Sequence, residues 1–145
     1  MAGAGSILLV EDDRDIRESI ADALEEEGYS VTSAIDGIDA LEKLRGGTLP
    51  QVILLDLMMP RMSGQELFEH VKQVREWRQI PIVLLTADAN ARSKAEALGA
   101  PAYLKKPVTL DQLFQTVARI LEGTPAREGE TSGALIDQRS CGSGG

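Results

Sequence analysis

Short, continuously apolar runs alternate along the chain with longer stretches that carry apolar residues at helical spacing. A run of about four apolar residues suits a β-strand that is covered on both faces, as in a parallel sheet. The runs that predict strands are residues 7–10, 29–34, 52–55, 82–85 and 102–104. Each run is followed by a stretch long enough for a helix, so the pattern predicts five strand–helix units.

The stretches after these runs have the periodicity and the end signals of amphipathic helices. Apolar residues recur every three or four positions, Ser, Thr or Asp precedes several of the stretches, and Gly follows them. The predicted helices are residues 13–27 before Gly28, a stretch from Asp36 to Gly46 and Gly47, a stretch after Ser63, residues 90–98 before Gly99, and a stretch from Thr109 to Gly123. Their predicted buried faces include Ile16, Ile38 and Leu110.

This alternation predicts an α/β fold in which a doubly wound parallel sheet carries helices on both faces. The repeating units run over residues 6–122, which we interpret as one domain. Residues 1–5 are then a short N-terminal extension. Residues 123–145 are rich in Gly, Ser and Thr, and we interpret them as a flexible tail or linker.

The composition agrees with one globular domain, since 43% of the 145 residues are hydrophobic and 26% are charged. A net charge of −8 disfavours binding to nucleic acid and to anionic membrane surfaces. Cys141 is the single cysteine, which excludes a disulfide within the chain. No apolar run approaches the ~20 residues of a membrane span, and the N-terminus has no signal-peptide pattern. We therefore expect a cytoplasmic protein.

Polar residues follow four of the five predicted strands. Because ligands of open α/β sheets bind at the carboxyl ends of the strands, these residues are candidates for a shared site. They are Glu11, Asp12 and Asp13 after the first strand, Asp56 after the third, Thr86 after the fourth, and Lys105 and Lys106 after the fifth. The pattern predicts carboxylates, a hydroxyl and an ammonium group at one edge of the sheet.

The acidic residues in this group require a counter-charge. Two carboxylates ~4 Å apart repel by roughly 4 kcal/mol at an effective dielectric constant of ~20, and one lysine cannot balance three of them. A hard divalent cation such as Mg²⁺ prefers oxygen ligands and often binds phosphate as well. A carboxylate beside such a metal can accept a phosphoryl group, and a lysine and a hydroxyl can neutralise the transferred oxygens. The sequence therefore favours phosphoryl transfer to Asp56.

The segments that carry these residues resemble the receiver domain of two-component response regulators, the CheY-like superfamily. The resemblance covers residues 6–122 and rests on segments 9–13, 54–64, 84–87 and 103–107. It implies a flavodoxin-like sheet with strand order 2-1-3-4-5 and five helices.

The resemblance also assigns roles to individual residues. Asp56 matches the phospho-accepting aspartate. The residues implied to hold Mg²⁺ are Glu11, Asp12, Asp56 and the backbone carbonyl of Met58, with Asp13 as an alternative to Asp12 if the first strand ends one residue later. The residues implied to bind the phosphate and to switch are Lys106, Thr86 and Tyr103, and the Lys106–Pro107 peptide is expected to be cis.

We therefore expect a phosphorylation-dependent signalling switch rather than an enzyme. Its implied partners are a histidine kinase or histidine phosphotransfer protein and an unknown downstream protein, with a phosphorylation-dependent homodimer as a further expectation. The expected output surface comprises residues 90–98, 102–104 and the last helix. Two alternatives remain: an Mg²⁺-dependent aspartyl phosphohydrolase of the haloacid-dehalogenase type, which uses the same residue types with its nucleophile after the first strand, and a phosphate-independent adaptor with the same fold.

Overall fold

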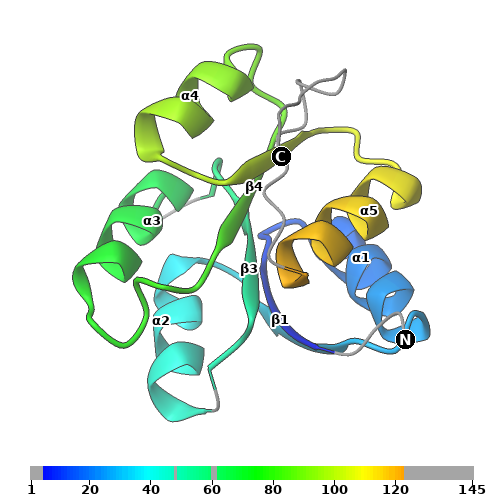
Figure 1. The fold of residues 1–145 in the computed structure, drawn as a ribbon, viewed down its shortest axis with the longest axis horizontal. Helices are drawn as coiled ribbons and strands as arrows, with labels where there is room; N and C mark the ends of the chain where they lie inside the picture. Colours follow the sequence, from blue (N-terminus) through cyan, green and yellow to red (C-terminus); the bar gives the residue numbers. More distant parts are fainter. Residues whose placement is uncertain (1–4, 48, 60–61, 123–145) are drawn as a thin grey trace.

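A computed structural model describes residues 5–47, 49–59 and 62–122 (Figure 1). The strands in this part of the chain are β1 (Ser6–Val10), β2 (Ser30–Ala34), β3 (Val52–Asp56), β4 (Ile82–Thr86) and β5 (Ala102–Lys105). The helices are α1 (Arg14–Glu26), α2 (Gly37–Gly46), α3 (Gly64–Gln73), α4 (Ala91–Leu98) and α5 (Leu110–Leu121). The predicted alternation of strands and helices is confirmed.

The strands form one parallel sheet in the order β2-β1-β3-β4-β5, as expected. Helices α1 and α5 cover one face, and α2, α3 and α4 cover the other (Figure 1). Successive side chains of a strand point to opposite faces, so Ile7 and Leu9 pack beneath α1 and α5 while Leu8 and Val10 pack beneath the other helices. Both faces of the sheet are therefore buried, which explains the continuously apolar strands.

Four of the helices begin at a side-chain cap, of which Asp36, Ser63 and Thr109 were predicted and Asp13 was not. Asp13, Asp36, Ser63 and Thr109 each accept a hydrogen bond from the backbone N–H three residues later. These bonds satisfy N–H groups that have no partner within the helix. Gly99 ends α4 with a φ of 77°, a left-handed conformation that favours glycine.

Three predicted core positions are wrong. Ile16, Ile38 and Leu110 keep 36%, 43% and 50% of their surface exposed. Each lies in the first turn of its helix, at the carboxyl edge of the sheet, where the helix begins beyond the strands. The helical period of the apolar residues is correct, but it does not predict that the first turn of each helix is exposed.

Some sequence interpretations concern residues outside the described part. These are the N-terminal extension up to residue 4, the end signal at Gly123, the tail and Cys141. Among the described residues, no helix combines the length and the apolar character that crossing a membrane requires.

Candidate functional site

The carboxyl edge of the sheet brings together side chains from β1, β3 and the segment after β5. Glu11 follows β1 directly, and its N–H donates to the carbonyl of Ala34 at 3.1 Å. Asp56 is the last residue of β3. The N–H of Lys106 donates to the carbonyl of Thr86 at 2.8 Å, which extends the β4–β5 pairing by one residue. Backbone pairing thus fixes where each functional side chain leaves the sheet.

Lys106 links the two buried carboxylates of the site. Its Nζ lies 2.9 Å from Glu11 Oε1 and 3.4 Å from Asp56 Oδ2. The Glu11 and Asp56 residues are 0% and 2% exposed, whereas the Lys106 side chain keeps 20% of its surface. The other oxygens accept backbone hydrogen bonds: Asp56 Oδ1 from Met58 N–H at 3.0 Å, and Glu11 Oε2 from Asp13 N–H at 3.1 Å. The two carboxylates are therefore held in fixed orientations.

Burial and charge shift the pKa values of this group. Burial raises the pKa of Asp56 from 3.8 to about 7, and the negative charge of Glu11 adds to the increase. The Met58 N–H and the charge of Lys106 oppose the shift without cancelling it. Burial alone lowers the pKa of Lys106, but its hydrogen bond to Glu11 and the nearby carboxylate charges outweigh this, so the net shift is upward. The positive charge of Lys106 thus does not offset the effect of burial on Asp56.

The acidic cluster fits a hard divalent cation. Carboxylate oxygens of Glu11, Asp12 and Asp56 lie within 4.8 Å of one another, with the first and last buried and Asp12 exposed. Such oxygens are the ligands that Mg²⁺ prefers, and the exposed side leaves room for water and a substrate oxygen. A cation bound here would favour the ionised form of Asp56, whose pKa is raised by burial.

The structure chooses between the two neighbouring aspartates. Asp13 Oδ1 accepts the N–H of Ile16 at 3.1 Å and caps α1, while Asp12 joins the acidic cluster. For Met58, the N–H contact with Asp56 is defined and the side chain is exposed. The metal-binding role of the Met58 carbonyl stays a prediction.

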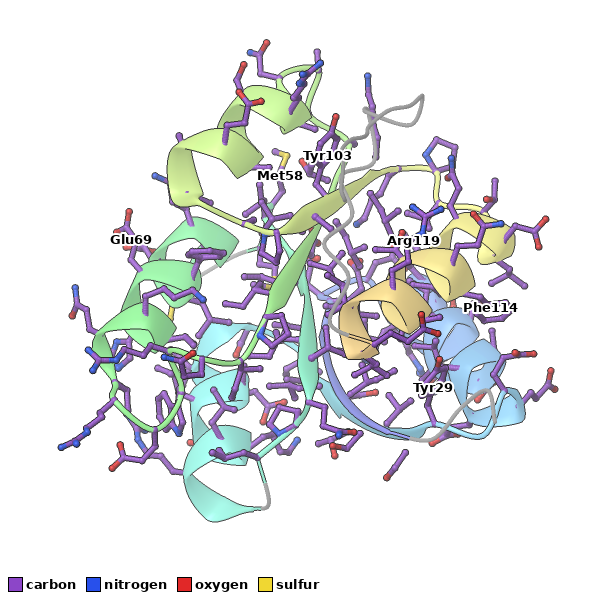
Figure 2. All side chains as sticks on the ribbon, in the orientation of Figure 1. Tyr29, Met58, Glu69, Tyr103, Phe114 and Arg119 are labelled. Atoms are coloured by element: carbon purple, nitrogen blue, oxygen red, sulfur yellow. The ribbon has the colours of Figure 1, made fainter. Side chains whose placement is uncertain are left out.

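The two predicted switch residues are on β4 and β5, beside the strand that carries Asp56 and on the next strand. Thr86 is fully buried at the end of β4, and its Oγ1 accepts the N–H of Asp88 at 3.0 Å. Tyr103 of β5 is 7% exposed and belongs to the core beneath α2, α3 and α4; Figure 2 labels it in the region of α4. The Lys106–Pro107 peptide is cis, as expected.

Two residues that support the site were not predicted from the sequence. Arg17 Nη1 donates to the carbonyls of Glu11 and Asp12 at 2.9 and 3.4 Å, which holds the backbone that carries the acidic pair. Asp88 fixes the hydroxyl of Thr86. An aspartate just before a helix is a recognisable capping signal, but nothing in the helical pattern of α1 marks Arg17.

Comparisons with known proteins agree with this fold and site. The family model described as "Response regulator receiver domain" matches residues 7–118, so the chain belongs to this family. "Response regulator MprA" from Mycobacterium sp. (strain KMS) is 38% identical over 131 residues, which cover 89% of this chain and 56% of MprA. The chain thus spans about half the length of this relative.

Solved structures give the same result for the fold. The chemotaxis protein CheY4 of Vibrio cholerae superposes with a TM-score of 0.73 at 32% identity, covering 79% of this chain and 97% of CheY4. Response regulator TrrA from Thermotoga maritima, solved in complex with Mg(2+)-BeF, gives 0.71 at 33% identity and the same coverages. The expected flavodoxin-like, CheY-like fold is confirmed.

Proposed function

We propose that this receiver domain is a phosphorylation-dependent switch that accepts a phosphoryl group on Asp56. The observation that carries the proposal is the buried Asp56 carboxylate beside Lys106 and within 4.8 Å of the Glu11 and Asp12 oxygens. Family membership favours this function over a phosphohydrolase. The donor we propose is a phosphohistidine of a histidine kinase or phosphotransfer protein, and the domain itself serves as acceptor rather than as a turnover enzyme. The cytoplasmic location stays a prediction.

The transfer itself is a substitution at phosphorus. An oxygen of Asp56 attacks the phosphorus atom, the bond from phosphorus to the donor's imidazole nitrogen breaks, and that nitrogen keeps the electron pair. Asp56 must be ionised to attack, and the positive charge of Lys106 favours the ionised form. Lys106 then neutralises charge on the phosphoryl oxygens.

Mg²⁺ is the cation we propose for the acidic cluster. Glu11, Asp12, Asp56 and the Met58 carbonyl would hold it, and when bound it would neutralise negative charge between Asp56 and the phosphoryl group. TrrA was solved with Mg(2+)-BeF, which supports Mg²⁺ as the cation for this chain.

We propose that Thr86 and Tyr103 communicate the phosphorylated state to a surface formed by α4, β5 and α5. The hydroxyl of Thr86 would donate to a phosphoryl oxygen, and the displacement would change the packing of the Tyr103 ring. A downstream protein, or a second copy of the chain, would then bind this surface. Small free-energy differences suffice for such a change in populations.

Phosphorylation with acetyl phosphate and Mg²⁺, followed by intact-mass measurement, tests the acceptor. We expect one phosphate adduct in the wild type, none in Asp56→Asn and none with excess EDTA. Asp111→Asn, which changes an exposed acid on α5, is the matched control and should keep the adduct. An adduct that persists in Asp56→Asn would exclude this acceptor. Continuous turnover of phosphomonoesters would instead favour the phosphohydrolase.

Lys106→Ala and Lys105→Ala form a matched pair that tests the role of the lysine. Lys105 is exposed, so its replacement should leave the nuclear magnetic resonance (NMR) response to beryllofluoride unchanged. Lys106→Ala should abolish that response, and it should also lower stability because two buried carboxylates lose their counter-charge. Circular dichroism therefore has to establish the folded fraction first. Equal responses in a folded Lys106→Ala protein and the wild type would contradict the role.

A further inference from the structure

Helix α4 begins differently from the other described helices. Its N-cap residue, Asn90, makes no side-chain hydrogen bond to the helix, whereas α1, α2, α3 and α5 all begin with one. The carboxylate of Asp88, two residues earlier, instead contacts the N-cap residue itself and a side chain of the helix. Asp88 Oδ1 accepts the N–H of Asn90 at 2.7 Å, and Oδ2 lies 2.7 Å from Lys94 Nζ, one turn into the helix.

The same residue also contacts the predicted switch hydroxyl. The backbone N–H of Asp88 donates to Thr86 Oγ1 at 3.0 Å, at the end of β4. Asp88 therefore connects a fully buried hydroxyl at the edge of the sheet with the first turns of α4. The connection consists of one short backbone segment and two hydrogen bonds to one carboxylate.

We infer that Asp88 and Lys94 form a latch that couples the hydroxyl of Thr86 to the start of α4 and favours the unphosphorylated arrangement. This inference rests on the proposed function. When the Thr86 hydroxyl moves towards a phosphoryl group on Asp56, the N–H of Asp88 loses its acceptor. The segment must then rearrange, and the carboxylate that holds Lys94 moves with it. By linkage, weakening the latch makes the phosphorylated arrangement easier to reach.

The environment of the latch supports this coupling. The hydrogen bond from Lys94 is the main reason why the pKa of Asp88 is lowered, and Lys105 at the end of β5 adds a smaller contribution. Helix α4 buries only Ala91 and Ala95 among its residues, so its apolar anchoring is weak. The pair is partly exposed, with 21% of the Asp88 and 43% of the Lys94 side chain accessible. Exposed ion pairs contribute little, so the expected effects are modest.

Hydrogen exchange of the unliganded protein tests the contact itself. Lys94→Met keeps the side-chain length and removes the donor, and we expect the amides of residues 90–94 to exchange about two- to fivefold faster. Arg92→Met is the matched control because it removes the neighbouring Arg92–Glu96 ion pair from the same helix. Thr86→Val removes the acceptor of the Asp88 N–H, and we expect faster exchange at the same residues. Identical exchange in Lys94→Met and Arg92→Met would overturn the latch.

Binding of Mg²⁺ with beryllofluoride, measured by calorimetry, tests the coupling. We expect Lys94→Met to bind about two- to fivefold more tightly than the wild type, with Arg92→Met unchanged. Equal affinity of the two variants, or weaker binding by Lys94→Met, would overturn the inference. Wild-type protein that shows no binding would overturn the proposed function and the coupling together. The exchange comparison above would still report whether Asp88 and Lys94 hold the helix.

Discussion

Strand β3 ends and helix α4 begins at the carboxyl edge of the sheet, but the two elements differ greatly in how much apolar surface they bury. All five residues of β3 are buried between two layers of helices, and its last residue is Asp56. Helix α4 covers the sheet with two buried alanines and begins at a carboxylate from the preceding segment. An acceptor must stay in place for transfer, whereas an element that reports the transfer must move at low cost. Under the proposed function, the two requirements fall on different elements.

The energetic basis of this difference is apolar burial. Fully burying a leucine or isoleucine side chain stabilises a fold by roughly 1.5–3 kcal/mol, and β3 buries four apolar residues in this way. An alanine side chain offers only one methyl group. Elements with little apolar burial open locally at low free energy, so α4 is expected to have lower local stability than β3.

The largest expected effect is a difference between two leucines. Leu54→Ala removes a fully buried side chain from β3 and should lower the free energy of unfolding by about 2–5 kcal/mol. Leu98→Ala, at the partly buried end of α4, should cost less than about 1.5 kcal/mol. Urea unfolding of both variants gives the comparison. Equal losses would show that α4 is as firmly anchored as β3, and the contrast would then be wrong.

The next expected effect concerns the contact between β3 and the start of α3. A Cβ atom on Gly64 would overlap the carbonyl oxygen of Asp56 and lie 2.6 Å from the Cα of Leu57, and backbone atoms cannot yield as a side chain does. Gly64→Ala should therefore destabilise the protein by about 1–3 kcal/mol and slow phosphorylation of Asp56. Gly46→Ala, where a Cβ meets nothing within 4 Å, is the control. Normal phosphorylation in a destabilised Gly64→Ala protein would show that this backbone contact stabilises the fold but is not needed for phosphorylation of Asp56.

Much of the sheet and of the helix starts could be predicted from the sequence because their signals are local. Apolar runs gave the strands, and the side chains of Asp36, Ser63 and Thr109 marked helix starts. Strand ends identified Asp56 and Lys106 as neighbours, since parallel strands bring their carboxyl ends together. The exposed first-turn residue Leu110 was not predictable, because helical periodicity does not state where the sheet beneath a helix ends.

The features that the sequence did not predict depend on single contacts. Asp12 and Asp13 are equivalent in the sequence, and the start of α1 decides that Asp13 caps the helix. Nothing in the sequence distinguishes Asp88 and Lys94 from other charged residues, and their ion pair is seen only in the structure. Such choices are made by three-dimensional placement, so a linear pattern leaves them open.

The smallest expected effect is the loss of folding stability that the buried Asp56 causes in the metal-free protein. The pKa of Asp56 is raised from 3.8 to about 7, mainly by burial. Between these pH values the unfolded chain has released the proton that the folded protein still holds, so folding stability falls as the pH rises from about 4 to about 7. Asp56→Asn lacks this charge and should be more stable than the wild type by about 1–2 kcal/mol above pH 7 in EDTA.

That value is smaller than the whole pKa shift implies, because a buried asparagine also needs hydrogen bonds and Lys106 loses one of its two carboxylates. Urea unfolding from pH 4 to 9 should show the advantage of Asp56→Asn shrinking towards pH 4. Asp22→Asn, an exposed change on α1, should show no such trend. Adding Mg²⁺ should reduce the advantage by stabilising the wild type. A constant difference across this pH range would mean that the buried charge of Asp56 does not destabilise the site.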